Sequence, residues 1–303
     1  MITFIKPGYR DYNVLKTYFT KDNIRHMENA WDIICDHVFG TTFFWREYYK
    51  TEYAIIDDSL VLKISTGGTI MFSVPIGGSD IPNVLRRIKE YAHSEGIPLY
   101  FCFVPESHIP FFHQVFDIVF ESEETDWSDF VYDISSLRDL SGRKYHGQKN
   151  HLNRFLKQNP DAEYVALSSE NAHLVKKFAE EWHSSSEELH DMAVAETNAV
   201  IDTLENWEKN HSFIGGYVAS SDRIIGFTIG EIVGDTVYVH AEKADHAIPG
   251  AYQFLSTSFL KNLGDPTVQF VNREEDMGLP GLRTSKMSLH PLKLLKKYTV
   301  YCC

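Results

Sequence analysis

The order of hydrophobic patterns constrains the fold of this chain more than any other feature of its sequence. After an N-terminal stretch of mostly helical pattern, alternating apolar residues predict three antiparallel strands over 52–57, 59–65 and 69–74. A helix over 81–96 and a buried strand over 98–104 follow. Helices, a strand meander, a helix and a strand together make one complete α/β unit.

The second half of the chain repeats this order. Strands are predicted over 212–219, 224–232 and 236–243, followed by a helix over 250–263 and a strand over 267–272. Because a helix separates the last two strands, we expect them to be parallel neighbours joined by a right-handed crossover. The pattern therefore predicts a duplication of the architecture, although the residues of the two halves do not match.

Length and composition agree with two folded domains. A chain of 303 residues is too long for one small core, and 43% hydrophobic residues can supply two. We predict an N-terminal domain over 1–137 and a C-terminal domain over 138–303, the second carrying the candidate active site. The predicted fold class is α/β (α+β).

Charge and cysteine usage exclude several kinds of partner. A net charge of -13 repels DNA and anionic membranes, so a polyanion must dock on a local basic patch. The four cysteines have neither metal-ligand spacing nor a disulfide framework, which is typical of a reducing compartment. No run of 18 apolar residues occurs. We therefore expect a cytoplasmic protein without an integral membrane segment.

A basic stretch near the middle of the chain, Ser141 to Lys157, provides such a patch. It holds five Lys and Arg residues and no acid. At helical spacing Arg143, Asn150 and Arg154 share one face, where they could bind phosphate. The apolar residues Tyr145, Leu152 and Leu156 are expected on the opposite face. A solvated basic face without a ligand fits the same spacing.

Three segments carry a resemblance to a known family: LSGRKYHGQKNHLNRF at 140–155, VNREEDMGLPGLRTSKMSLHP at 271–291, and the strand over 294–301. They resemble the C-terminal catalytic domain of phosphatidylglycerol lysyltransferases, which is similar to Fem-type aminoacyl transferases. The resemblance implies two tandem GNAT-like acyltransferase domains. It also implies transfer of an aminoacyl group from charged tRNA to an amine or hydroxyl acceptor. An acyl-CoA donor is less favoured, because only Gly250 and Ala251 remain of the loop that binds its pyrophosphate.

The candidate site lies where the two predicted parallel strands end, near 243–245 and 272–274. Acyl transfer there needs a base, cations for the oxyanion and the donor phosphates, and an orienting amide. The candidates are Asp276 and Glu242 as bases, Lys286 and Arg283 as cations, and Asn272 as the amide. Gly250 opens a helix whose free N–H groups suit a phosphate.

Two alternatives remain open on the sequence. Asp276 could close a turn with Gly278, and the whole chain could be a non-catalytic module that binds an anion or nucleotide. His183, Glu187 and His190 have the spacing of helical metal ligands, but no motif supports them, and we expect no metal site. No cofactor is expected beyond the donor substrate, and the sequence does not indicate an oligomeric state.

Overall fold

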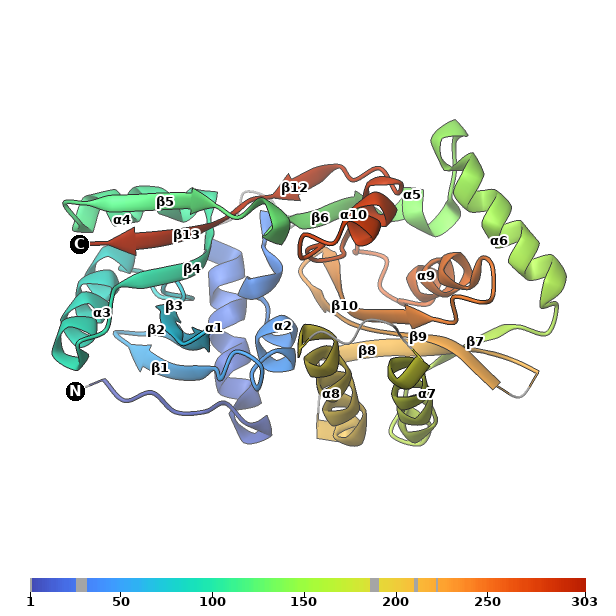
Figure 1. Ribbon diagram of the computed structural model, residues 1–303, viewed down its shortest axis with the longest axis horizontal. Helices are drawn as coiled ribbons and strands as arrows, with labels where there is room; N and C mark the ends of the chain where they lie inside the picture. The colour runs from blue at the N-terminus through green and yellow to red at the C-terminus, as the bar shows by residue number, and fades with distance from the viewer. Residues whose placement is uncertain (1, 26–31, 186–190, 210–211, 222) are drawn as a thin grey trace. The chain divides into compact units, whose positions relative to one another are not determined.

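The chain forms two compact units, traced in Figure 1. This computed structural model describes residues 2–25, 32–185, 191–209, 212–221 and 223–303. Unit 1 comprises Met1–Asp129, Glu275–Pro280 and Leu294–Cys303, and unit 2 comprises Phe130–Glu274 and Gly281–Lys293. The units differ from the predicted segments 1–137 and 138–303 mainly at the C-terminal end, because the last strand of the chain pairs with strands of unit 1.

The strands of unit 1 form a six-stranded sheet in the order β1-β2-β3-β4-β13-β5. The strands are β1 (Glu52–Ile56), β2 (Ser59–Thr66), β3 (Thr69–Phe72), β4 (Tyr100–Pro105), β5 (Val119–Glu123) and β13 (Lys297–Cys302). Strands β3 and β4 are parallel, with Phe72 opposite Phe101, and the other neighbours are antiparallel. The parallel pair is joined through a helix, as parallel strands require.

Helices cover both faces of this sheet. They are α1 (Tyr12–Arg25), α2 (Phe39–Phe44), α3 (Ile81–Glu95) and α4 (Ile109–Val115). The alternation along β2 assigns the faces: Val61 packs with α3 and α4, whereas Leu60 and Leu62 pack with α1 and α2. Helix α3 begins where the Asp80 carboxylate accepts a hydrogen bond from the backbone N–H of Asn83, as its sequence indicates.

The second sheet has seven strands in the order β12-β6-β11-β10-β9-β8-β7, and all of its residues except Asp129, Leu294 and Leu295 belong to unit 2. The strands are β6 (Asp129–Asp133), β7 (Glu163–Ala166), β8 (Phe213–Ser220), β9 (Arg223–Val233), β10 (Thr236–Ala244), β11 (Phe270–Asn272) and β12 (Lys293–Leu295). Strands β10 and β11 are parallel, with Tyr238 opposite Asn272, which confirms the predicted crossover. The meander β8-β9-β10 is antiparallel, also as predicted.

Two groups of helices cover the sheet of unit 2, as Figure 1 shows. They are α5 (Ile134–Asp139), α6 (His146–Gln158), α7 (Ala172–Ser185), α8 (Asp191–Glu205), α9 (Ala251–Lys261) and α10 (Pro280–Met287). Helix α9 packs with α5 and α6 on one face. On the other face α7 contacts β9, where the rings of Phe178 and Phe227 meet.

Helix α6 departs from the predicted orientation at its C-terminal end. Tyr145 is buried and Leu152 half-buried, but Leu156 is 44% exposed and Phe155 is buried instead. The prediction for Leu156 was wrong because the side of α6 that faces α9 is centred on Phe155, so that Leu156 at its margin reaches solvent. Phe155 then packs with the first residues of α9.

Candidate active site in unit 2

A pocket of unit 2 opens beyond the carboxyl ends of the parallel strands β10 and β11. It encloses about 490 Å³, including open solvent at its mouth. Strand β10 contributes Glu242, the residue after β11 contributes Arg273, and α9 contributes Tyr252 and Gln253. Gln148 of α6 hydrogen-bonds Gln253 at 2.8 Å and so ties two of the surrounding helices together. The pocket therefore has the position at which α/β sheets bind their ligands.

An ion pair between Glu242 and Arg273 lines this pocket. Arg273 Nη2 donates to Glu242 Oε1 over 2.7 Å, and the side chains are only 17% and 5% exposed for Arg273 and Glu242 respectively. Burial by itself lowers the pKa of the Arg273 guanidinium, but the Glu242 carboxylate outweighs burial and raises that pKa. The site thus offers a fixed cation beside a carboxylate in a largely dry environment.

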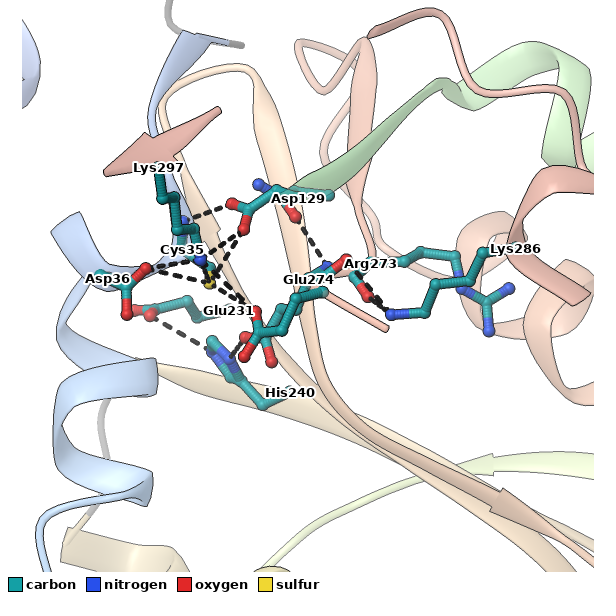
Figure 2. Close-up of polar contacts among 11 residues, drawn as sticks. Cys35, Asp36, Asp129, Glu231, His240, Arg273, Glu274, Lys286 and Lys297 are labelled. Atoms are coloured by element: carbon teal, nitrogen blue, oxygen red, sulfur yellow. Dashed lines mark hydrogen bonds and ion pairs between the residues drawn. The ribbon is translucent and has the colours of Figure 1, made fainter. Parts of the chain in front are cut away.

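The backbone that presents Arg273 is held by two of the predicted catalytic residues. Asn272 is fully buried, and its Oδ1 accepts a hydrogen bond from the Glu274 N–H at 2.8 Å. Lys286 Nζ donates to the carbonyl oxygens of Arg273 at 2.5 Å and Glu274 at 3.2 Å (Figure 2). Glu274 has φ +56°, which a non-glycine residue adopts only when its surroundings hold it there. These contacts fix the chain as it leaves β11.

His240 forms a second buried charge cluster in the same unit. A β-bulge interrupts β10 between Val239 and Ala241. The bulged His240 has Nδ1 2.7 Å from Glu274 Oε1 and Nε2 3.3 Å from Glu231 Oε1 (Figure 2). Burial lowers the pKa of this imidazole, but the two carboxylates outweigh burial and raise the pKa to about 9. His240 is therefore an imidazolium at neutral pH and is not a base there.

The predicted phosphate-binding residues lie on two helices of unit 2 and at their ends. Asn150 and Arg154 are exposed on α6, and Arg143 is exposed in the 3-10 turn before it. Arg283 is half-buried on α10. Gly250 caps α9 with φ +86°, and a Cβ there would collide with the backbone of α6 at His151. Gly250 is therefore required for close helix packing, whether or not a phosphate also binds.

Asp276 belongs to the part of the chain that returns to unit 1. It is fully buried, and its Oδ1 accepts a hydrogen bond from the Gly278 N–H at 3.0 Å. Gly278 has φ +72°, and a Cβ at that position would lie 2.8 Å from Asp126 Oδ2. The geometry is that of the turn considered as the alternative for this aspartate.

Unit 1 contains a buried ionic cluster around Lys297. Its Nζ lies 2.6 Å from Asp36 Oδ2, 2.7 Å from Asp129 Oδ1 and 3.4 Å from Glu275 Oε2 (Figure 2). Cys35, Asp129 and Glu275 offer ligand atoms within 4.8 Å of one another, the spacing of a metal site. The Lys297 ammonium lies among these atoms, 3.2 Å from Cys35 Sγ, and supplies the positive charge.

The sequence also offered His183, Glu187 and His190 as residues at the spacing of helical metal ligands. Glu187 and His190 lie outside the described residues.

Comparison with known proteins identifies the family. Residues 32–301 match the family model described as phosphatidylglycerol lysyltransferase, C-terminal. The chain belongs to this family. A protein of Mycoplasmoides gallisepticum described as uncharacterised is 25% identical over 185 residues, which make up 61% of this chain and 58% of that protein. The matched region thus covers less than two thirds of that relative.

Solved structures of other proteins have a fold similar to that of this member of the phosphatidylglycerol lysyltransferase family. A conserved protein of unknown function from Bacteroides thetaiotaomicron has a TM-score of 0.88 and 28% identity, with both chains fully covered. L-PGS from Bacillus licheniformis has a TM-score of 0.64 and 14% identity, with 87% of this chain and 86% of that chain covered. FemX has a TM-score of 0.53 and 10% identity, covering 99% and 97%.

These matches confirm the family resemblance and the predicted fold class. The fold is α/β (α+β) with two sheets, and it matches FemX over nearly the whole chain, as expected for tandem GNAT-like units. Within the described parts of the chain, no helix is both long and apolar enough to cross a lipid bilayer.

Sequence reasoning assigned no individual role to three residues at the centre of the charge clusters: Arg273, His240 and Lys297. Arg273 directly follows Asn272 at a predicted strand end, a position that could have marked it. Lys297 lies within an apolar strand pattern, LLKKYTVY, where a buried lysine requires a carboxylate partner. For His240 the signal was weaker, because its partners come from another strand and from a loop.

Proposed function

We propose that this chain transfers an activated acyl group to an amine or hydroxyl acceptor, with the aminoacyl group of charged tRNA as the favoured donor. The observation that carries the proposal is the family match over residues 32–301, whose description names lysyl transfer. The fold likeness to L-PGS and FemX supports it. An acyl-CoA thioester is the second donor to test. A cytoplasmic location follows from the favoured donor, which is made there.

The reaction is proposed at the Glu242–Arg273 pocket. The acceptor nitrogen or oxygen attacks the carbonyl carbon of the aminoacyl ester, forming a new amide or ester bond while the bond to the ribose oxygen breaks. Glu242 accepts the proton that the acceptor loses and returns it to the departing ribose oxygen. The Arg273 guanidinium, which has further N–H groups beyond the one bonded to Glu242, stabilises the carbonyl oxygen as its charge develops.

The other predicted residues take supporting roles in this proposal. Asn272 and Lys286 position Arg273 through the backbone bonds described above. Asp276, whose carboxylate closes a buried turn, shapes the following loop. Arg143 is exposed in the turn before α6, and Arg154 is exposed on α6 itself. These two arginines bind the phosphates of the donor, because an acidic protein needs a local basic surface to hold a polyanion.

A transfer assay with matched ion-pair variants tests the proposal. The protein is incubated with tRNA charged with labelled amino acids and a panel of amines and alcohols, and label in the acceptor is counted. Glu242→Gln should lower transfer by at least about 100-fold, because it removes the base. Glu196→Gln is the control: Glu196 pairs with Lys243 at the same 2.7 Å, with both side chains under one fifth exposed. Its transfer rate should stay within about twofold of the parent.

Equal loss in both variants would show that breaking any ion pair of unit 2 inactivates the protein, and would remove Glu242 as the base. The alternative function is a non-catalytic module that binds an anion or nucleotide. The observation that favours it is the direct bond between Glu242 and Arg273, which satisfies both groups without a substrate. Binding of charged tRNA or CoA without transfer to any acceptor of the panel would establish this alternative.

A further inference from the structure

Unit 1 contains its own pocket at the carboxyl ends of its parallel strands. Ser73, directly after β3, and Cys102 and Phe103 of β4 line it. The pocket encloses about 570 Å³ including open solvent. Phe103 has φ +52°, and the pairing of β4 with β13 shifts register close by. The irregular backbone of β4 therefore coincides with the place where α/β sheets bind ligands.

Two acidic side chains line this pocket. Asp36 and Glu275 both line it, and their side chains are 17% and 12% exposed. They share the Lys297 ammonium with the fully buried Asp129. Burial first, and the neighbouring carboxylates second, raise the pKa of the Cys35 thiol well above its usual value, so that the thiol is neutral. Two carboxylates, those of Asp36 and Glu275, therefore line the cavity.

The walls of the pocket are aromatic. Trp45, Tyr49 and Phe103 line it, with ring centroids 6.4 Å apart for Trp45 and Tyr49 and 5.9 Å apart for Tyr49 and Phe103. Burial raises the pKa of Tyr49, so its phenol stays protonated and adds no charge. The faces of such rings attract cations, and their area accepts an apolar body. Among the described residues lining this pocket there is no Lys or Arg.

We propose that the unit 1 pocket binds a protonated amine carried on a short apolar body. The ammonium lies beside the carboxylates of Asp36 and Glu275, while the apolar body packs between Trp45, Tyr49 and Phe103. The inference concerns binding in unit 1 alone and does not depend on acyl transfer in unit 2. A metal ion is disfavoured because the Lys297 ammonium already occupies the place among the possible ligands.

The proposed site predicts a pH dependence of binding. Asp36 faces Lys297, Glu275 and Asp129, and burial, opposed by the Lys297 ammonium, raises the pKa of Asp36 to about 6. A bound ammonium favours the ionised carboxylate, so binding strengthens as the pH rises from 5 to 7.5. A primary amine stays protonated across this range, so the change reports the protein and not the ligand.

Isothermal titration calorimetry with matched probes on the full chain tests the site. The probes are n-pentylammonium, the neutral 1-pentanol and the anion pentanoate, and the peptide Gly-Lys-Gly with blocked ends presents the same group as a lysine side chain. We expect one of the two ammonium probes to bind at least about tenfold more tightly than pentanol, and pentanoate not to bind. The tighter of the two ammonium probes then identifies a free amine or a protein side chain as the ligand.

Three variants locate the binding. Glu275→Gln removes one of the lining carboxylates, and Trp45→Ala removes an aromatic wall without changing the ionic cluster. Each should weaken ammonium binding at least about fivefold. Glu47→Gln, with a side chain that is 82% exposed, should leave it unchanged. Equal affinity for pentanol and pentylammonium, or unchanged binding in Trp45→Ala, overturns the proposal. Trp45→Ala decides the outcome even where Glu275→Gln fails to fold.

Discussion

Replacing Lys297 by Met tests how the buried cluster of unit 1 contributes to stability. The side chain of Lys297 is 1% exposed, and its ammonium contacts Asp36, Asp129 and Glu275 within 3.4 Å. Burial by itself lowers the pKa of this ammonium, but the carboxylates outweigh it and raise the pKa well above its usual value. Met fills a similar volume but provides no charge, so the variant leaves three carboxylates buried without their cation.

The expected cost at pH 7.5 is about 3 to 5 kcal/mol, the usual result of removing one partner from a buried ion pair. That loss is a large part of the total stability of about 5 to 15 kcal/mol that a folded domain has. The effect should decrease at lower pH. Without the ammonium, the folded-state pKa of Asp36, which burial already raises, rises further above its unfolded value. The folded variant therefore takes up protons more readily than the unfolded chain and gains stability as the pH falls.

Urea denaturation followed by circular dichroism at pH 7.5 and 5.5 measures both effects, and hydrogen exchange locates the loss in unit 1. Lys296→Met is the matched control, because the adjacent lysine is 46% exposed and its ammonium pairs with Glu123 at 3.0 Å near the surface. We expect no measurable shift for the control. A Lys297→Met variant as stable as Lys296→Met at pH 7.5, or a gap between them that widens at pH 5.5, would refute the reasoning.

Two further predictions concern unit 2. His240 is held as an imidazolium with a pKa of about 9, so its stabilising effect is full below the ordinary histidine pKa and is lost as the pH rises through 9. The stability gap between the parent and His240→Asn should therefore shrink between pH 7 and 10; a constant gap would show that charge plays no part. Exchanging Arg143 and Arg154 together for Gln should leave the melting temperature unchanged and lower the log-log salt slope of tRNA binding by about 0.7 to 0.9 for each phosphate released. Lost stability with an unchanged salt slope would contradict the phosphate role.

Local patterns determined most of the secondary structure of this protein and the architecture of each half. Helix α3 follows from its apolar spacing and the Asp80 cap, and the meander β8-β9-β10 follows from alternating residues between short turns. The parallel pair β10 and β11 was predictable because a helix separates two strands with short connections. These features depend on neighbours in sequence, which is why one sequence was sufficient to find them. A pocket lies at the ends of β10 and β11, where the rule for ligand positions in α/β sheets had placed the candidate site.

Tertiary structure alone decided which charged residues meet. Strand β13 inserts between β4 and β5, so Lys297 reaches carboxylates as far away in sequence as Asp36, and no local pattern indicates that pairing. Long-range packing also exposes Leu156, whose spacing had placed it with the core, and buries Phe155 against α9. Lys286 was recognised as a candidate cation, yet its bonds to two backbone carbonyls depend on how the chain turns after β11. Sequence periodicity records which side of its own element a residue occupies, whereas the partner across that side is determined only when distant segments pack together.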